Sequence, residues 1–285
     1  MTQRQQALNG TVSPEMITVA QYEGLDPEYV RSGVAEGTIA IPKNSKRSFP
    51  DVRGIGKGLR TKINANIGSS PYHMDIREEI EKLHAAVHCG ADAVMDLSLG
   101  SELIYIRREI ISESPVTIGT VPIYQTAFEL SSSCRDITEM TIDDYLKTVR
   151  NQAEEGVDFM TIHSGVTLQA LAALESQKRV LDVVSRGGSF LVSWMKKNGR
   201  QSPLYEYYDE ILDILAAYDV TISLGDGMRP GATADATDRA QITELVTLAE
   251  LAQRAWDKGV QVIIEGPGHV PLNMVQEHIR LQKSL

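Results

Sequence analysis

Hydrophobic and polar residues follow a repeating pattern along the chain from Lys62 onward. Each repeat has a short apolar run typical of a buried strand, a polar or glycine-bearing motif at its carboxyl end, and then an amphipathic helix. Because strands that alternate with helices pair in parallel, this pattern predicts an α/β domain on a parallel sheet. Seven strands are predicted, in the segments KINANIG, AVMDLS, VTIGTVPIY, FMTIH, VLDVVSRGG, VTISLGDG and VQVIIEGPGH.

Six amphipathic helices are predicted between and after these strands. They cover residues 75–89, 102–112, 141–155, 205–218, 238–258 and 273–285, and Thr141 with Asp144 forms a capping box. Seven βα units are one short of a (β/α)8 barrel, and an open seven-stranded barrel would leave two unpaired edges. We therefore expect a (β/α)8 TIM-type barrel truncated after the seventh βα unit, with an open doubly wound sheet as the alternative.

The first 55 residues are predicted to be an N-terminal appendage to the incomplete barrel domain at residues 56–285. Ser13-Pro14-Glu15 and Asp26-Pro27-Glu28 each combine an N-cap residue, a proline at the first helical position and an acid that suits the helix dipole. Two short helices should begin there. Residues 38–42 are predicted as an edge strand and the polar residues 43–51 as a linker.

Composition narrows the class of protein. A chain of 285 residues with 42% hydrophobic residues can bury one large core, and its formal charge of -10 argues against a nucleic-acid partner. No apolar run is long enough to span a membrane, and the amino terminus lacks a signal-peptide core. Cys89 and Cys134 form no CxxC pair, which indicates a reducing compartment. We expect a soluble cytoplasmic protein that binds neither nucleic acid nor membrane.

Polar residues at the strand ends form the predicted site, because α/β barrels carry their sites at this edge. Glu265 and His269 flank a Gly-Pro-Gly turn after the last strand. They are either an acid/base pair or half of a metal site, since no HxxxH or HxH partner is near. His278, in the last helix, is predicted to be exposed.

Four further strand ends carry candidate ligand-binding side chains. Asn66 can orient a heterocycle or a ribose, with an Asx-turn as the alternative, and Tyr124 can stack on a ring or be an interior tyrosine. Met95 is by itself most often a core residue, and His163 a buried histidine with satisfied hydrogen bonds. The residues alone leave all four assignments open.

Two loops carry groups suited to an anion. In Ser185-Arg186-Gly187-Gly188, backbone N–H groups freed by glycine can form an anion-binding nest, with Ser185 and Arg186 as additional phosphate ligands. In Asp226-Gly227-Met228-Arg229, the acid can bind polar hydrogens of a substrate while Arg229 binds its phosphate or carboxylate. A structural salt bridge between Asp226 and Arg229 is the alternative.

Taken together, seven motifs in this order and spacing resemble the ThiC family, over nearly the whole chain from Ser13: NANIG, VMDLS, GTVPIYQ, DFMTIH, VVSRGG, SLGDGMRPG and EGPGHVP. The resemblance implies a radical S-adenosylmethionine (SAM) enzyme, phosphomethylpyrimidine synthase of thiamine biosynthesis. Such a lyase converts 5-aminoimidazole ribotide to 4-amino-5-hydroxymethyl-2-methylpyrimidine phosphate with a radical generated at a [4Fe-4S] iron-sulfur cluster. It also implies a homodimer in full-length members.

The resemblance assigns roles residue by residue. His269 corresponds to the first metal-binding histidine, which usually binds zinc or another divalent metal. The implied ribotide-binding residues are Asn66, Met95, Tyr124, His163, Ser185, Arg186, Gly187, Asp226, Gly227, Met228, Arg229 and Glu265.

The sequence departs from the family pattern in three respects. The long amino-terminal domain of many bacterial members is absent, as in short forms from anaerobes and archaea. The usual DLSTGG is DLSLGS at residues 96–101, and TLGEL is TLAEL at residues 247–251. These changes leave 5-hydroxybenzimidazole synthase as an alternative, a paralogue that uses the same ribotide in anaerobic cobalamin biosynthesis.

The third departure concerns the carboxyl end. The family's eighth strand, a further substrate tyrosine, a second metal histidine and the CxxCxxxxC cluster motif would lie beyond Leu285, and Cys89 and Cys134 cannot replace that motif. We therefore expect no cluster ligands in this chain and no activity of the chain alone, as either a fragment or a natural truncation. A non-catalytic barrel fragment that binds ribotide or metal is the third hypothesis.

Overall fold

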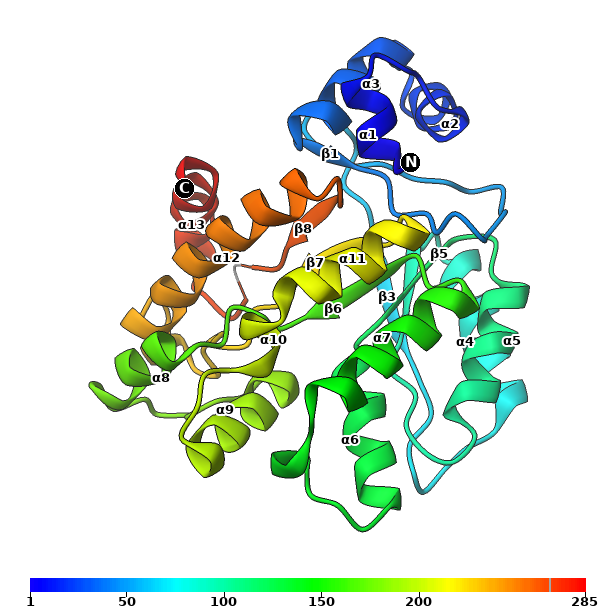
Figure 1. Cartoon of the computed structure of the whole chain (residues 1–285). Coiled ribbons are helices and arrows are strands. Elements are labelled where there is room, and N and C mark those ends of the chain that lie inside the picture. Colours follow the sequence, from blue (N-terminus) through cyan, green and yellow to red (C-terminus); the bar gives the residue numbers. More distant parts are fainter. Residues whose placement is uncertain (267) are drawn as a thin grey trace.

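Six of the apolar runs form one parallel sheet at the centre of the molecule (Figure 1). The computed structural model describes residues 1–266 and 268–285. The strands lie side by side in chain order and all point the same way, so their carboxyl ends share one edge. They are β3 (Asn64–Ile67), β4 (Ala93–Asp96), β5 (Thr117–Thr120), β6 (Phe159–Ile162), β7 (Thr221–Leu224) and β8 (Val262–Ile264).

The strand predicted in VLDVV is not formed, so the prediction of seven strands was wrong. β6 pairs directly with β7, which leaves no place between them for another strand. Asp235 accepts hydrogen bonds from the backbone N–H groups of Val180 and Leu181 at 2.7 and 2.9 Å and so holds this segment as a loop. The Val180 side chain is 69% exposed, unlike the buried residues of a central strand.

The α/β class is confirmed, whereas the barrel is not established. β3 and β8 are the two edges of the sheet, and no strand pairing joins them within the part of the chain that the structure describes. Both edge strands are more exposed than the four strands between them. The sheet is therefore open, and a truncation after a seventh unit is not established either.

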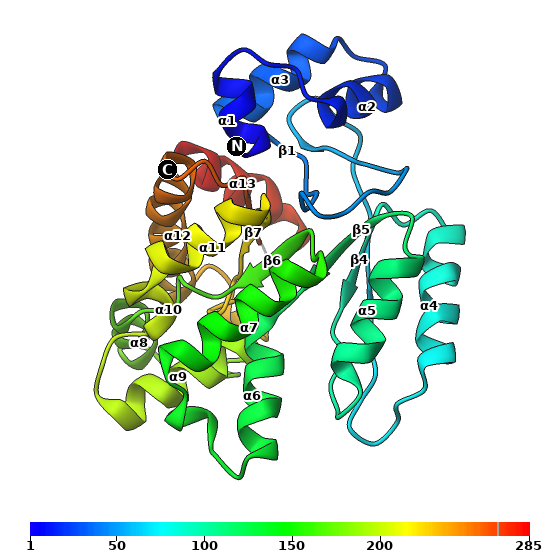
Figure 2. The same cartoon turned by 45° about the vertical axis from the view of Figure 1, so that its right-hand side comes forward.

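Helices lie around the sheet in both views (Figures 1 and 2). The predicted capping box is confirmed, since the Thr141 hydroxyl accepts a hydrogen bond from the Asp144 N–H group at 3.2 Å. The helices are α4 (Ile76–His88), α5 (Leu103–Glu113), α6 (Pro122–Ser132), α7 (Ile142–Glu155), α8 (Leu168–Glu175), α9 (Arg186–Asn198), α10 (Pro203–Glu206), α11 (Tyr208–Tyr218), α12 (Arg239–Asp257) and α13 (Val275–Ser284). Short 3-10 turns are η1 (Ile137–Glu139), η2 (Thr233–Asp235) and η3 (Leu272–Met274).

The strand predicted in VTIGTVPIY is shorter than expected, because helix α6 takes up the end of this segment. The strand ends at Thr120, and Pro122 begins a helix because its ring fixes a helical φ and its missing N–H is not needed in the first turn. Tyr124 therefore lies in the first turn of α6 and not on a strand. No helix among the residues described is long and apolar enough to cross a membrane.

The amino-terminal residues pack over the amino ends of the strands (Figure 1). The two predicted helices are present as α2 (Pro14–Glu23) and α3 (Pro27–Glu36), with Ser13 and Asp26 as their N-caps. A further helix, α1 (Gln3–Leu8), was not predicted. The predicted edge strand is β1 (Ile39–Ala40), which pairs with β2 (Ile55–Gly56). The Thr2 hydroxyl donates to the Gly259 carbonyl at 2.6 Å, just before β8.

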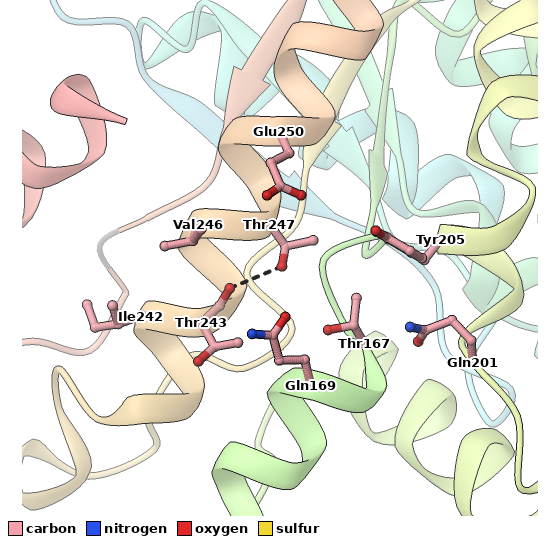
Figure 3. Close-up of a pocket in the computed structure, with 9 residues that line it drawn as sticks. All are labelled: Thr167, Gln169, Gln201, Tyr205, Ile242, Thr243, Val246, Thr247 and Glu250. Carbon is pink, nitrogen blue, oxygen red and sulfur yellow. Dashed lines mark hydrogen bonds between the residues drawn. The ribbon is translucent and has the colours of Figure 1, made fainter.

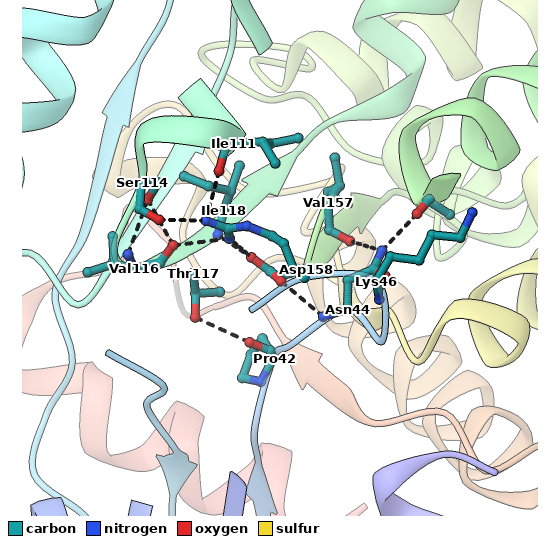
Figure 4. A network of polar contacts seen from close by, with 12 residues as sticks. Pro42, Asn44, Lys46, Ile111, Ser114, Val116, Thr117, Ile118, Val157 and Asp158 are labelled. Atoms are coloured by element: carbon teal, nitrogen blue, oxygen red, sulfur yellow. Dashed lines mark hydrogen bonds and ion pairs between the residues drawn. The ribbon is translucent and has the colours of Figure 1, made fainter. Parts of the chain in front are cut away.

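Residues 43–51, predicted as a polar linker, contain two buried side chains that join this segment to the sheet (Figure 4). Asp158, immediately before β6, accepts hydrogen bonds from the backbone N–H groups of Asn44 at 2.9 Å and Ile118 at 2.8 Å. It also forms an ion pair with Arg47. The Asp158 carboxylate thus connects the amino-terminal segment to the amino ends of β5 and β6.

Candidate functional site

The predicted site lies at the opposite edge of the sheet. The Gly225 N–H group donates to the Ile162 carbonyl at 3.0 Å, and the Glu265 N–H group donates to the Leu224 carbonyl at 2.9 Å. These bonds continue the sheet pairing by one residue past the strand ends. His163, Gly225 and Glu265 consequently lie at one level, directly after β6, β7 and β8.

Glu265 and the loop after β7 form a compact charged group. Arg229 Nη1 lies 2.8 Å from Asp226 Oδ1, so the salt bridge that the sequence left open is present. Glu265 Oε1 accepts a hydrogen bond from the Thr161 hydroxyl at 3.0 Å. The Asp226 N–H group donates to Glu265 Oε2 at 3.4 Å. Burial and the nearby Asp226 carboxylate raise the pKa of Glu265 to about 7, so it can exchange a proton near neutral pH.

His163 is packed between two glycines, one in the first turn of α9 and one directly after β7. A Cβ atom at Gly187 would lie 2.5 Å from His163 Nδ1, and one at Gly225 would lie 2.9 Å from His163 Cδ2. Burial lowers the pKa of His163 to about 4, so the imidazole is neutral at pH 7. Its buried Nδ1 atom has no hydrogen-bond partner among residues 1–266 and 268–285. It is thus not the buried, satisfied histidine that the sequence most simply suggested.

The Ser185-Arg186-Gly187-Gly188 motif begins helix α9 and does not follow a strand, which corrects the prediction. The Ser185 hydroxyl is the N-cap and accepts a hydrogen bond from the Gly188 N–H group at 3.1 Å. The first N–H groups of a helix lack intrahelical partners and attract anions. The Arg186 guanidinium lies 5.1 Å from the centre of the Tyr124 ring, so this motif and α6 meet.

Asn66 and Met95 share the carboxyl edge but not these contacts. They are directly paired between β3 and β4. Asn66 is exposed and accepts a hydrogen bond from Asn64 Nδ2 at 3.0 Å, whereas Met95 is 9% exposed. Direct contacts therefore connect His163, the start of α9, Asp226–Arg229 and Glu265, while Asn66 and Met95 lie farther along the same edge.

Two residues on the carboxyl-terminal helices differ from expectation. His278 was predicted to be exposed, but it is 6% exposed and its Nε2 atom lies 2.6 Å from the Thr237 hydroxyl. Glu244 of α12 was not singled out. It is 2% exposed and accepts a hydrogen bond from the Met228 N–H group at 2.8 Å. Its position on the apolar face of α12, between Ala240 and Leu248, is the sequence signal that could have identified it.

A separate pocket of about 270 Å³ lies between α8, α10 and α12 (Figure 3). Polar side chains such as Gln169, Gln201 and Thr247 line it. None of the predicted site residues does, so this pocket is distinct from the strand-end site.

Comparison with known proteins identifies the family. The sequence model of the radical SAM ThiC family matches residues 2–285. The chain belongs to this family. It is 52% identical over 285 residues to phosphomethylpyrimidine synthase of Desulforamulus reducens and 53% identical to that of Desulforudis audaxviator. The alignments cover 100% of this chain and 66% of each relative, so the chain spans just under two thirds of their length.

A solved structure, dihydropteroate synthase from Stenotrophomonas maltophilia, matches 82% of this chain and 95% of its own. Its sequence identity is 10% and its TM-score 0.30, and so weak a likeness carries no argument about the fold.

Membership of the radical SAM ThiC family implies an enzyme that uses S-adenosylmethionine and a [4Fe-4S] cluster. Iron-sulfur clusters are held by several cysteine thiolates, and this sequence contains only Cys89 and Cys134, both exposed. Its residues therefore do not fit the cluster. His269 is exposed with φ of 56°, and across the described ranges no group of three His, Cys, Asp or Glu side chains could hold a metal ion. They do not assemble a zinc site either.

Proposed function

We propose that the carboxyl edge of the sheet binds 5-aminoimidazole ribotide, and that the protein converts it to 4-amino-5-hydroxymethyl-2-methylpyrimidine phosphate in thiamine biosynthesis. The observation that carries this proposal is the position of His163 between Gly187 of α9 and Gly225, the residue directly after β7. The His163 side chain therefore lies between the start of α9, which attracts anions, and the loop that carries Asp226 and Arg229. Glu265 lies beside that loop. A ribotide needs both kinds of group, because it joins a phosphate to a polar heterocycle.

The phosphate would bind at the start of α9. The N–H groups of Arg186 and Gly187 belong to the first turn, and the Arg186 guanidinium is exposed beside them. Arg229 adds a second cation, which its ion pair with Asp226 holds in place. Ser185 supports this arrangement as the N-cap of the helix.

The heterocycle and ribose would be oriented by the remaining groups. Glu265 can accept or donate a hydrogen bond, because its pKa of about 7 leaves both protonation states populated near neutral pH. The Tyr124 ring offers a stacking surface, and the neutral His163 imidazole and the Asn66 amide offer polar atoms. These residues supply binding and orientation, while the family's SAM and cluster supply the radical chemistry.

The names of the relatives support this reaction over the 5-hydroxybenzimidazole alternative, since those at 52% and 53% identity are phosphomethylpyrimidine synthases. A product assay tests it directly. The protein from its complete reading frame, reconstituted without oxygen, should yield 5′-deoxyadenosine and hydroxymethylpyrimidine phosphate from the ribotide and SAM. Hydroxybenzimidazole as the product would establish the paralogue's reaction. Bound ribotide without 5′-deoxyadenosine formation would leave only a binding protein.

A further inference from the structure

We propose that Glu244 is a positioning residue for the ligand-binding loop Asp226–Arg229, and that it acts through hydrogen bonds. This inference rests on the proposed function for the identity of the ligand. Glu244 comes from α12, outside all the strand-end motifs, and it does not itself need to touch a ligand.

The first observation is a single backbone anchor. Glu244 Oε2 accepts the Met228 N–H group at 2.8 Å, and both residues are almost completely buried. Met228 lies between Asp226 and Arg229, whose ion pair spans the same short loop. A change in the Met228 backbone would therefore move both charged groups together.

The second observation is close packing beneath two loops. A Cβ atom at Gly227 would lie 3.2 Å from Glu244 Oε1, and one at Gly165 would lie 2.9 Å from Glu244 Cγ. Gly165 follows His163 in the loop after β6, and Gly227 belongs to the loop after β7. The Glu244 side chain thus packs against both the loop after β6 and the loop after β7.

The third observation is an unused oxygen. Glu244 Oε1 is buried and has no hydrogen-bond partner among the residues described. Glu244, Asp226, Glu265 and His278 line a cavity of about 30 Å³, a volume that suits one water molecule.

The protonation of Glu244 follows from these surroundings. Burial, with the Asp226 and Glu265 carboxylates close by, raises the pKa of Glu244 well above its ordinary value. A protonated Glu244 accepts from Met228 through one oxygen and can donate to water in the cavity through the other. A glutamine amide can make the same two hydrogen bonds, which provides a conservative replacement.

The test compares three variants with wild type: Glu244→Gln, Glu244→Leu and, as control, Glu250→Gln on an exposed position of the same helix. One readout is hydrogen exchange at the Met228 amide, which needs no ligand. The other is calorimetric affinity for 5-aminoimidazole ribotide. We expect Glu244→Leu to raise the exchange rate and weaken the affinity, each at least tenfold. Glu244→Gln and Glu250→Gln should stay within threefold of wild type.

Normal Met228 protection and affinity in Glu244→Leu would overturn the proposal, and so would a Gln variant as impaired as the Leu variant. If the Leu variant does not fold, Glu244→Asp replaces it, because the shorter side chain withdraws the carboxyl group from Met228. Wild-type protein that does not bind the ribotide would refute the proposed function, while the exchange measurement would still test the loop anchor.

Discussion

Asp158 at the amino edge of the sheet and the polar groups at its carboxyl edge differ in how completely their hydrogen bonds are made. At the amino edge, the Asp158 carboxylate accepts hydrogen bonds from two backbone N–H groups (Figure 4). It also forms an ion pair with Arg47. At the carboxyl edge, Glu244 Oε1 and His163 Nδ1 are buried without partners in the part of the chain described. Glu265 there is held so that its pKa rises to about 7.

This difference is the one expected between a structural carboxylate and polar groups available to a ligand. A buried charge whose hydrogen bonds are all made within the protein has nothing left to offer a ligand. Buried groups with unused hydrogen-bonding capacity and shifted pKa values are typical of binding and catalytic sites. The comparison therefore supports a stabilising role for Asp158 at the amino edge, and it agrees with the ligand binding that we propose for the carboxyl edge.

The largest effect should come from the amino edge. Arg47→Ala leaves the Asp158 carboxylate buried without its cation, and breaking such a pair costs about 3–5 kcal/mol. Urea denaturation should show this loss as a lower free energy of unfolding. Arg280→Ala, which removes an exposed pair with Glu277, is the control and should cost a small fraction of it. Equal losses in the two variants would contradict the role assigned to Asp158.

A smaller effect on stability, but a large one on binding, should follow from Gly188→Ala. A Cβ atom there would lie 2.3 Å from the Gly227 carbonyl oxygen, so the start of α9 and the β7 loop must separate. Overpacking of this kind costs about 1–3 kcal/mol. Because both parts belong to the proposed site, their separation should also lower ribotide affinity at least about tenfold.

Gly199→Ala is the matched control. Gly199 caps the end of the same helix with φ of 61°, and among the residues described no atom lies within 4 Å of an added Cβ. It should cost about 1 kcal/mol through backbone strain and leave binding unchanged. Similar affinities in the two alanine variants would show that the contact between the loops is unimportant.

A further effect is a change in the pH dependence of stability. Glu265 has a folded-state pKa of about 7 against an ordinary value of 4.5, so between these pH values the folded state holds more protons than the unfolded state. Stability must then fall as pH rises through this window, with a slope of up to about 1.4 kcal/mol per pH unit from this group. Glu265→Gln should remove this contribution.

Denaturation of wild type and Glu265→Gln from pH 4 to 8 measures the difference. Burial also raises the pKa of Asp158 to about 6, so Asp158 also makes stability fall as pH rises. This effect is present in both proteins and cancels in the difference between them. Parallel stability curves would contradict the protonation assigned to Glu265.

Local chemistry explains which parts of the fold the sequence predicts. Helix starts such as Ser13, Asp26 and Thr141 are recognisable because an N-cap bonds to a backbone group only three or fewer residues away. The strand in VLDVV could not be excluded in the same way. An apolar run becomes a strand only if a neighbouring strand has a free edge to pair with. β6 and β7 pair with each other, so neither offers a free edge to VLDVV.

The site shows the same division. Strand-end motifs located Asp226, Arg229 and Glu265, because their position follows from the direction of the strands. Glu244 and His278 reach the same cavity from α12 and α13, and only tertiary packing brings them there. The capping role of Ser185 likewise depended on knowing where α9 begins.

Calorimetry of the 285-residue protein with 5-aminoimidazole ribotide tests the central claim, that the carboxyl edge is the ligand-binding edge. Wild type should bind. Arg229→Ala should bind about tenfold to a hundredfold more weakly, as expected for a charge-assisted contact of about 1.5–3 kcal/mol. Arg239→Ala, which removes an exposed arginine at the start of α12, should bind like wild type. No binding by wild type, or equal affinities of wild type and Arg229→Ala, would contradict the claim.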